Sequence, residues 1–255
     1  MHCADAVQEG FDLARFFVSP DAFSDRTVLL EGEQAAHAKV LRLAAGDEVV
    51  LCDGQATDYR CVIRDISPKQ VLLDVCAKER SRGEPALQCS IYMGFPKADK
   101  FEHVVQKATE LGACEIIVFP CTRSISRPDA KSLSKKLERW QKIAESAAEQ
   151  SGRGRIPAVL ALSSFEEAVS RAAEAQFSAL FYENEHTLSM RAALSLPCAS
   201  AALMTGPEGG LTEAEVRCAQ QAGMQVCSLG PRILRCETAP LSALSALMFA
   251  AGEMD

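Results

Sequence analysis

The chain has 255 residues with ordinary hydrophobic and charged fractions of 48% and 24%, enough for one large domain or two smaller ones. Its net charge of −7 argues against binding nucleic acid through bulk charge, and no charge-free stretch reaches the roughly 20 residues of a membrane helix. Eleven cysteines without a C-x-x-C pair, and an amino terminus without a secretory signal, predict a cytoplasmic protein with reduced thiols, no disulfide framework and no metal site.

The first part of the chain is expected to form a small β-rich domain. Apolar or alternating stretches separated by turn signals predict five strands, which cover residues 15–18, 27–30, 48–52, 59–66 and 71–75. The spacing of Ala36, Val40 and Leu43 predicts one helix over residues 33–43. These elements together suggest a small barrel. His37 has no second metal-type ligand near it in sequence, which favours a structural or RNA-facing histidine.

A charged segment at residues 78–85 contains glycine and proline, has no apolar period, and predicts a linker. We therefore divide the chain into a first domain at residues 1–79, a linker at 80–88 and a second domain at 89–255. From residue 89 onward strands alternate with helices, which predicts a mostly parallel sheet covered on both faces. The expected strands cover residues 90–95, 115–119, 158–162, 177–182, 201–204 and 225–229. Capping boxes are predicted at Ser163 with Glu166 and at Thr212 with Glu215.

Two glycine-bearing loops lie in the last third of the chain, and each follows a strand and leads into a helix. The first reads Gly-Pro-Glu-Gly-Gly at residues 206–210, and the second spans residues 229–239. In parallel sheets such loops meet at the carboxyl ends of the strands, where ligands bind. Neither loop matches a dinucleotide fingerprint or a P-loop, and Glu208 would oppose a polyphosphate. An uncharged or cationic ligand with an adenine and a ribose fits these loops better.

Positive charge gathers in the middle of the chain. Residues 81–160 carry a net charge of +4, whereas residues 1–80 carry −5 and residues 161–255 carry −6. Nine basic and four acidic residues lie between Arg123 and Arg155. A basic band on an acidic protein is the footprint expected for local contact with phosphates, and a solvated helix face is the alternative.

The two glycine loops resemble the S-adenosylmethionine site of the SPOUT methyltransferases, and specifically of the RsmE family, through Gly-Pro-Glu-Gly-Gly and the later Leu-Gly and Ile-Leu-Arg-x-Glu-Thr-Ala. Further matches are Arg-Phe-Phe-Val at 15–18, Lys-Ala-Thr-Glu-Leu-Gly at 107–112 and Arg-Trp-x-Lys-Ile-Ala at 139–144. The resemblance therefore covers nearly the whole chain. That family methylates N3 of a uridine in small-subunit ribosomal RNA.

The resemblance implies an α/β carboxy-terminal SPOUT domain with a trefoil knot and a mostly parallel sheet, preceded by a PUA-like β-barrel domain that binds RNA. It implies S-adenosyl-L-methionine as cofactor, a homodimer, and 16S rRNA near the decoding region, within the small ribosomal subunit, as substrate. The implied cofactor contacts are Tyr182, Glu183, Thr205, Gly206, Glu208, Gly209, Leu229, Gly230, Ile233, Leu234 and Ala239. The candidates for RNA contact are Arg15, Arg42, Lys97, Arg123 and Arg153.

Methylation at N3 of uridine requires a proton acceptor and fixed positive charge beside the flanking carbonyl oxygens. Arg235 is the candidate for the positive charge, and Glu237 is the candidate proton acceptor. Structural alternatives stay open for these residues. Arg235 could pair with Glu237 to brace the loop, Glu237 could favour the start of the last helix, and Glu208 could accept hydrogen bonds from loop amides.

Two other functions compete with this interpretation. A SPOUT ribose 2′-O-methyltransferase of tRNA or rRNA would place a catalytic arginine near the start of the α/β domain, where this chain has Lys-Ala-Asp-Lys at residues 97–100. A non-catalytic RNA-binding ribosome-assembly factor is the alternative from another class, and the two intact glycine loops argue against it.

Overall fold

The computed structural model of this protein describes residues 13–24, 26–67, 69–125 and 128–254. The chain forms two compact units. The first consists of Met1–Glu84 and Ala148–Arg155, and the second consists of Pro85–Ala147 and Ile156–Asp255. The first unit is therefore discontinuous in sequence, because it includes a segment that follows it in the chain by more than sixty residues. The expected division into continuous domains did not include this later segment.

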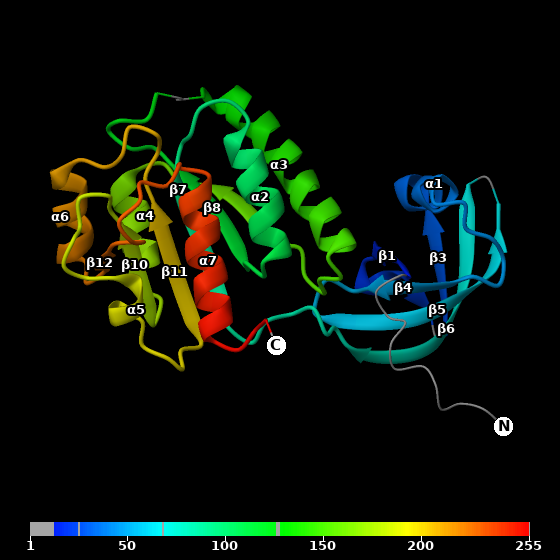
Figure 1. The fold of residues 1–255 in the computed structure, drawn as a ribbon. Helices are drawn as coiled ribbons and strands as arrows, with labels where there is room; N and C mark the ends of the chain where they lie inside the picture. Colours follow the sequence, from blue (N-terminus) through cyan, green and yellow to red (C-terminus); the bar gives the residue numbers. More distant parts are fainter. Residues whose placement is uncertain (1–12, 25, 68, 126–127, 255) are drawn as a thin grey trace. The chain divides into compact units, whose positions relative to one another are not determined.

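The strands of the first unit form one curled sheet in the order β1-β4-β5-β6-β3-β2 (Figure 1). They are β1 (Ala14–Phe17), β2 (Phe23–Ser24), β3 (Thr27–Glu31), β4 (Glu48–Cys52), β5 (Thr57–Ile66) and β6 (Gln70–Arg80). Helix α1 (Gly32–Val40) packs Ala35 and Ala38 onto the apolar core of this sheet. The helix ends earlier than the expected residue 43, and Arg42 has a left-handed φ of 58° that a continuing helix would not allow.

A buried ion pair and a hydrogen bond from a second buried ion pair connect the segment 148–155 to the rest of the first unit. Arg153 Nε donates to Glu84 Oε1 at 2.7 Å, and these two side chains are 3% and 5% exposed. The same carboxylate oxygen accepts hydrogen bonds from the backbone amides of Gly154 and Arg155. Arg15 donates to both oxygens of Asp58, at 2.7 and 2.6 Å, and to the carbonyl of Arg153. Each buried charge thus has an opposite charge beside it, which such a location requires.

The second unit is built on a six-stranded sheet in the order β12-β10-β11-β7-β8-β9 (Figure 1). Its strands are β7 (Gln88–Gly94), β8 (Glu115–Phe119), β9 (Ala158–Ala161), β10 (Phe177–Phe181), β11 (Ser200–Thr205) and β12 (Gln225–Cys227). All five pairings in this order are parallel. The prediction of a mostly parallel sheet is confirmed.

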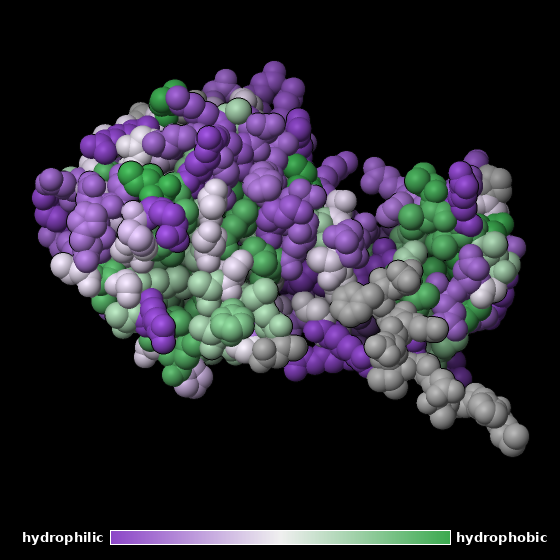
Figure 2. Space-filling view, in the orientation of Figure 1, coloured by the Kyte–Doolittle hydropathy of each residue, from purple (hydrophilic) through white to green (hydrophobic). Residues whose placement is uncertain are grey.

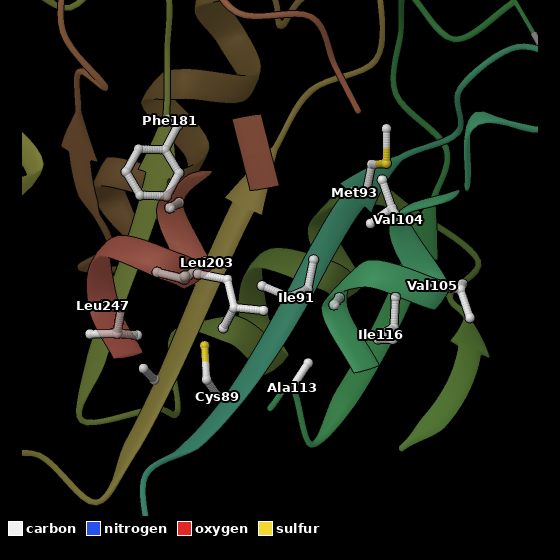
Figure 3. Packing of buried hydrophobic residues seen from close by; sticks show 14 of the residues in the cluster. Cys89, Ile91, Met93, Val104, Val105, Ala113, Ile116, Phe181, Leu203 and Leu247 are labelled. Carbon is white, nitrogen blue, oxygen red and sulfur yellow. The ribbon is translucent and has the colours of Figure 1, made fainter. Parts of the chain in front are cut away.

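Helices cover both faces of this sheet. They are α2 (Lys100–Glu110), α3 (Ala130–Gln150), α4 (Phe165–Ala172), α5 (Met190–Ala193), α6 (Glu213–Gln221) and α7 (Thr238–Ala250). One core lies on the face covered by α2, α3 and α7, where Ile91, Val104 and Leu247 are buried together (Figure 3). A second core lies on the opposite face under α4 and α6, and it contains Tyr92 and Val216. Because neighbouring residues of β7 point to opposite faces, Ile91 and Tyr92 belong to different cores.

The helix starts agree with the expected caps in one case and differ in another. The capping box of α6 is confirmed, since Thr212 and Glu215 exchange side-chain-to-backbone hydrogen bonds. At α4 the expectation was shifted by one residue: Ser164 is the N-cap and accepts from the amide of Glu167. Within the described ranges, no helix is long and apolar enough to cross a membrane.

Candidate functional site

Four strands of the second unit end side by side. In register, Met93 of β7 lies beside Thr205 of β11, Thr205 beside Phe181 of β10, and Phe181 beside Cys227 of β12. The loops that leave this edge of the sheet cover residues 95–99, 182–189, 206–212 and 228–237. The two glycine-bearing loops therefore start on either side of β10. This is the position that a ligand takes in parallel sheets whose strand order changes direction.

The loop after β10 supplies the residues between the two glycine loops. Tyr182 directly follows the strand, and its hydroxyl accepts a hydrogen bond from the side chain of Asn184 at 3.0 Å. The Glu183 carboxylate lies so close to Gly210 that a Cβ there would stand 2.3 Å from Oε1. Gly210 also has a φ of 67°, a backbone conformation that favours glycine. Glu183 thus borders the first glycine loop.

The first glycine loop is braced by the loop that follows β8. Arg123 Nη1 donates to the carbonyls of Gly209 and Leu211, at 3.2 Å in each case. The buried Glu215 carboxylate accepts from the amide of Thr122 at 2.8 Å. A Cβ on Gly209 would lie 2.9 Å from Cβ and 3.0 Å from the carbonyl oxygen of Arg123. Gly209 is one of the cofactor contacts that the resemblance implies, and its contact with Arg123 alone already excludes a larger residue.

The second glycine loop is more open. Gly230 has a φ of 102°, and no heavy atom lies within 4 Å of the place where its Cβ would be. Ile233, one of the expected cofactor contacts, is 87% exposed. Leu229 is partly buried against the core of the second unit. This loop therefore has one end fixed on the core and presents apolar and basic side chains to the outside.

An ionic cluster joins the two glycine loops to the start of α2. The ammonium group of Lys100 lies 3.2 Å from Glu208 Oε1 and 3.0 Å from Glu237 Oε2. Its nitrogen is also 3.7 Å from the sulfur of Cys236. Glu208 accepts hydrogen bonds from the backbone amide of Lys97 as well, at 3.0 and 3.3 Å. The expectation that Glu208 accepts from a loop amide is confirmed.

This cluster changes the chemical roles available to Glu237. Partial burial alone would raise the pKa of its carboxyl, but hydrogen bonds from its own amide and from Lys100 lower the pKa to about 2. The Lys100 pKa is raised, first by its hydrogen bond to Glu237. A carboxylate held in this way stays ionised at neutral pH and is a weak proton acceptor. The alternative pairing of Glu237 with Arg235 is not what the structure has, because Glu237 pairs with Lys100.

Lys100 was not singled out by the sequence. It stands in the stretch Lys-Ala-Asp-Lys at residues 97–100, which carries no motif of its own. A lysine that opens a helix directly behind a parallel strand is a weak signal by itself. Its partners are 108 or more residues away in the chain, at Glu208 and Glu237, and only the folded sheet brings them together.

The other predicted site residues differ in how far they are exposed. Thr205 ends β11 and is buried, with its hydroxyl directed to the carbonyl of Tyr92. Leu234 and Ala239 are half-buried, whereas Arg235 and Gly230 are exposed. Gly206 is crowded by Leu211, whose Cγ would lie 3.0 Å from an added Cβ.

Two of the five candidates for RNA contact are wrong as surface groups. Arg153 is 3% exposed and is committed to Glu84, and Arg15 is held by Asp58 with a side chain only 11% exposed. A guanidinium that neutralises a buried carboxylate cannot leave it for a phosphate without a large desolvation cost. Lys97, Arg123 and Arg42 are exposed, although Arg42 belongs to the first unit.

The basic band lies largely on α3. Lys131, Lys135 and Lys142 are exposed, while Arg139 pairs with Glu102 at 2.7 Å. Lys136 lies 5.7 Å from the ring centre of Trp140. Figure 2 shows mainly hydrophilic residues over α2 and α3 in this view. Arg127, which the basic count includes, lies outside the described residues.

His37 has a structural environment. Its ring packs edge-on against Phe16, with ring centres 5.5 Å apart, and its Nδ1 is 4.0 Å from a carboxylate oxygen of Glu149. In the described residues no group of three or more His, Cys, Asp or Glu side chains could hold a metal ion.

Comparisons with known proteins agree with both units. Residues 83–248 match the family model of the RNA methyltransferase domain, and residues 30–76 match that of the RNA methyltransferase PUA domain. The chain is similar to ribosomal RNA small subunit methyltransferase E of Bacillus subtilis, with 40% identity over 88% of this chain and 90% of the relative. The corresponding Synechocystis protein is 35% identical over 91% of this chain and 76% of its own length.

A solved structure is similar over almost the whole chain. It is the Neisseria gonorrhoeae ribosomal RNA small subunit methyltransferase E bound to S-adenosyl methionine, with a TM-score of 0.83 and 30% identity. The match covers 93% of this chain and 98% of that one.

Proposed function

The chain belongs to the ribosomal RNA small subunit methyltransferase E family, and from this membership we propose that it transfers the methyl group of S-adenosylmethionine to N3 of a uridine in 16S rRNA. The row of four strand ends that brings both glycine loops to one edge of the sheet carries this proposal. The enzyme would act in the cytoplasm on RNA near the decoding region of the small subunit. Digestion of methylated product RNA to nucleosides tests the proposal, because it distinguishes a methyl group on the base from one on the ribose oxygen.

We place the cofactor between the two glycine loops, with the loop after β10 as the third wall. The similar Neisseria enzyme binds S-adenosyl methionine, which supports this choice of ligand. The proposed contacts are Tyr182, Glu183, Thr205, Gly206, Glu208, Gly209, Leu229, Gly230, Ile233, Leu234 and Ala239. Backbone amides of the glycine loops would supply most of the polar contacts, since the glycines have no side chain of their own to keep a ligand from the backbone.

We also propose a knotted carboxy-terminal end and a homodimer. Helix α7 belongs to the same core as α2, after the chain has passed through β11 and β12. Packing of the last helix beside the first elements of the unit is compatible with a trefoil knot. Phe249 of α7 is 72% exposed, and burial against a second copy would remove this apolar side chain from water.

Replacement of Gly209 by valine tests the cofactor site. The new side chain would overlap Arg123, whose carbonyl oxygen would already lie 3.0 Å from a Cβ, so the first glycine loop must shift. Calorimetry should show an affinity for S-adenosylmethionine that is weaker by about tenfold or more, corresponding to about 1.4 kcal/mol. Gly223→Val, in the turn after α6, is the matched control: it adds the same side chain at a glycine whose φ is 89°, but it has open space around it. An equal loss of affinity for S-adenosylmethionine in the two variants would contradict the placement of the cofactor at the first glycine loop.

RNA binding should depend on the exposed lysines of α3. If Lys142 contacts a phosphate, Lys142→Glu should weaken RNA binding and reduce the slope of log K against log salt by about 0.7 to 0.9 for each lost contact. Arg217→Glu on α6 makes the same change of charge at the other edge of the sheet and should leave the slope unchanged. Cofactor affinity should stay constant in both variants. If Lys142→Glu leaves the slope of log K against log salt unchanged, the exposed lysines of α3 form only a solvated helix face.

A further inference from the structure

Lys100 is placed where three separate segments of the second unit meet. It is the first residue of α2, and its ammonium group contacts one carboxylate from each of the two glycine-loop regions. Glu208 belongs to the loop after β11, and Glu237 lies at the end of the loop after β12. These strands are not neighbours, because β10 lies between them. One side chain therefore connects two loops that the sheet itself leaves separate.

The turn before Lys100 is fixed by the same carboxylate. Glu208 accepts from the amide of Lys97, and the next residue, Ala98, has a φ of 53°. Residues other than glycine rarely adopt this left-handed conformation, and they keep it only where surrounding contacts hold it. Lys100, Glu208 and Glu237 are 29%, 25% and 19% exposed, so water screens their interactions only in part. The Cys236 thiol donates to the Glu237 carboxylate at 3.3 Å and completes its surroundings.

We infer that Lys100 is a positioning residue for methyl transfer: through Glu208 and Glu237 it holds the two glycine loops at the separation that the cofactor requires. This inference rests on the proposed cofactor site. In this role Glu208 and Glu237 are anchors of the loops, and neither takes a proton from the substrate. Removing the ammonium group would leave two carboxylates facing each other without a counter-charge, and their repulsion would separate the loops.

Calorimetry with S-adenosylmethionine on the full-length protein tests this role. Lys100→Met should raise Kd by about tenfold or more, because the loops lose their common partner. Lys100→Arg should recover part of the affinity, since it restores a positive charge with different geometry. The double variant Lys100→Met with Glu237→Gln should also bind better than Lys100→Met alone, because it removes the repulsion. If Lys100 only filled space, neither Lys100→Arg nor the added Glu237→Gln would restore affinity for S-adenosylmethionine.

Lys107→Met is the matched control on the same helix. Lys107 pairs with Glu110 at 2.7 Å, so its removal also breaks a lysine–glutamate pair, but it does so away from the glycine loops. Its Kd should equal that of the wild type. If Lys100→Met does not fold, as judged by circular dichroism, Lys100→Gln replaces it in the same comparison.

The possible results separate this inference from the proposed function. Wild-type protein that does not bind S-adenosylmethionine would overturn the proposed cofactor site. Wild-type binding combined with an unchanged Kd in Lys100→Met, or a loss that neither Lys100→Arg nor Glu237→Gln relieves, would overturn the positioning role alone.

Discussion

Arg235→Ala should lower the single-turnover rate of methylation by about 10²-fold or more while changing the affinity for S-adenosylmethionine little, as expected for a group that stabilises developing charge. When N3 of uridine loses its proton, negative charge spreads onto the flanking carbonyl oxygens. Arg235 is exposed at the end of the second glycine loop, and its neighbour Glu237 is paired with Lys100. Glu237, the carboxylate nearest to Arg235 in sequence, therefore does not neutralise the positive charge of Arg235.

Rates with saturating RNA and cofactor, measured as a function of pH, would check this expectation. The wild-type rate should rise with pH above neutral until the bound uridine is ionised. Arg235→Lys should recover part of the rate, because an ammonium group replaces the planar guanidinium fork. Arg232→Ala removes another exposed arginine of the same loop and serves as the control. Equal losses for Arg232→Ala and Arg235→Ala, or a methyl group on the ribose oxygen, would refute the role of Arg235.

Glu84→Ala should destabilise the first unit by about 3 to 5 kcal/mol, the usual cost of removing one partner of a buried ion pair. The substitution leaves the 3% exposed guanidinium of Arg153 without its carboxylate and leaves two backbone amides without their acceptor. Glu213→Ala is the control, because it breaks an exposed pair with Arg217 that should contribute about 0 to 1 kcal/mol.

Hydrogen exchange can assign this loss of stability to the correct unit. The single tryptophan, Trp140, is buried in the second unit, so its fluorescence does not report on the first. Amides of β5 and β6 should exchange faster in Glu84→Ala, whereas those of β7 and β11 should keep their protection. Unchanged protection in β5 and β6 would show that the pair does not stabilise the first unit.

Local patterns in the sequence predicted the parallel sheet and the position of the glycine loops. Alternating strands and helices can be read from residues that are close together in sequence. The same holds for the capping box of Thr212 and Glu215, which the structure contains. The shift from Ser163 to Ser164 at α4 shows the limit of such patterns, since both serines precede acidic residues at the required spacing.

Pairings between distant residues could not be predicted in this way. Arg153 was predicted to be one of the exposed cations of the basic band. Its partner Glu84 is 69 residues away in sequence, so no local pattern shows that the two form a pair. The position of Lys100 in the ionic cluster could not be predicted for the same reason, because its partners lie in two loops of the last third of the chain. Glu237 was the candidate proton acceptor because a carboxylate is the natural base for uridine N3. In the fold it pairs with Lys100, which lies far from it in sequence.

The discontinuous first unit also constrains the order in which this protein acquires its structure during synthesis. Glu84 leaves the ribosome 69 residues before Arg153, which at about 5 to 20 residues per second is a delay of about 3 to 14 s. During that interval the nascent β-rich unit lacks the segment 148–155 that neutralises its buried carboxylate. The amino-terminal unit is therefore not complete when its own 84 residues have been made, and a fragment cut at that point would lack part of its interior.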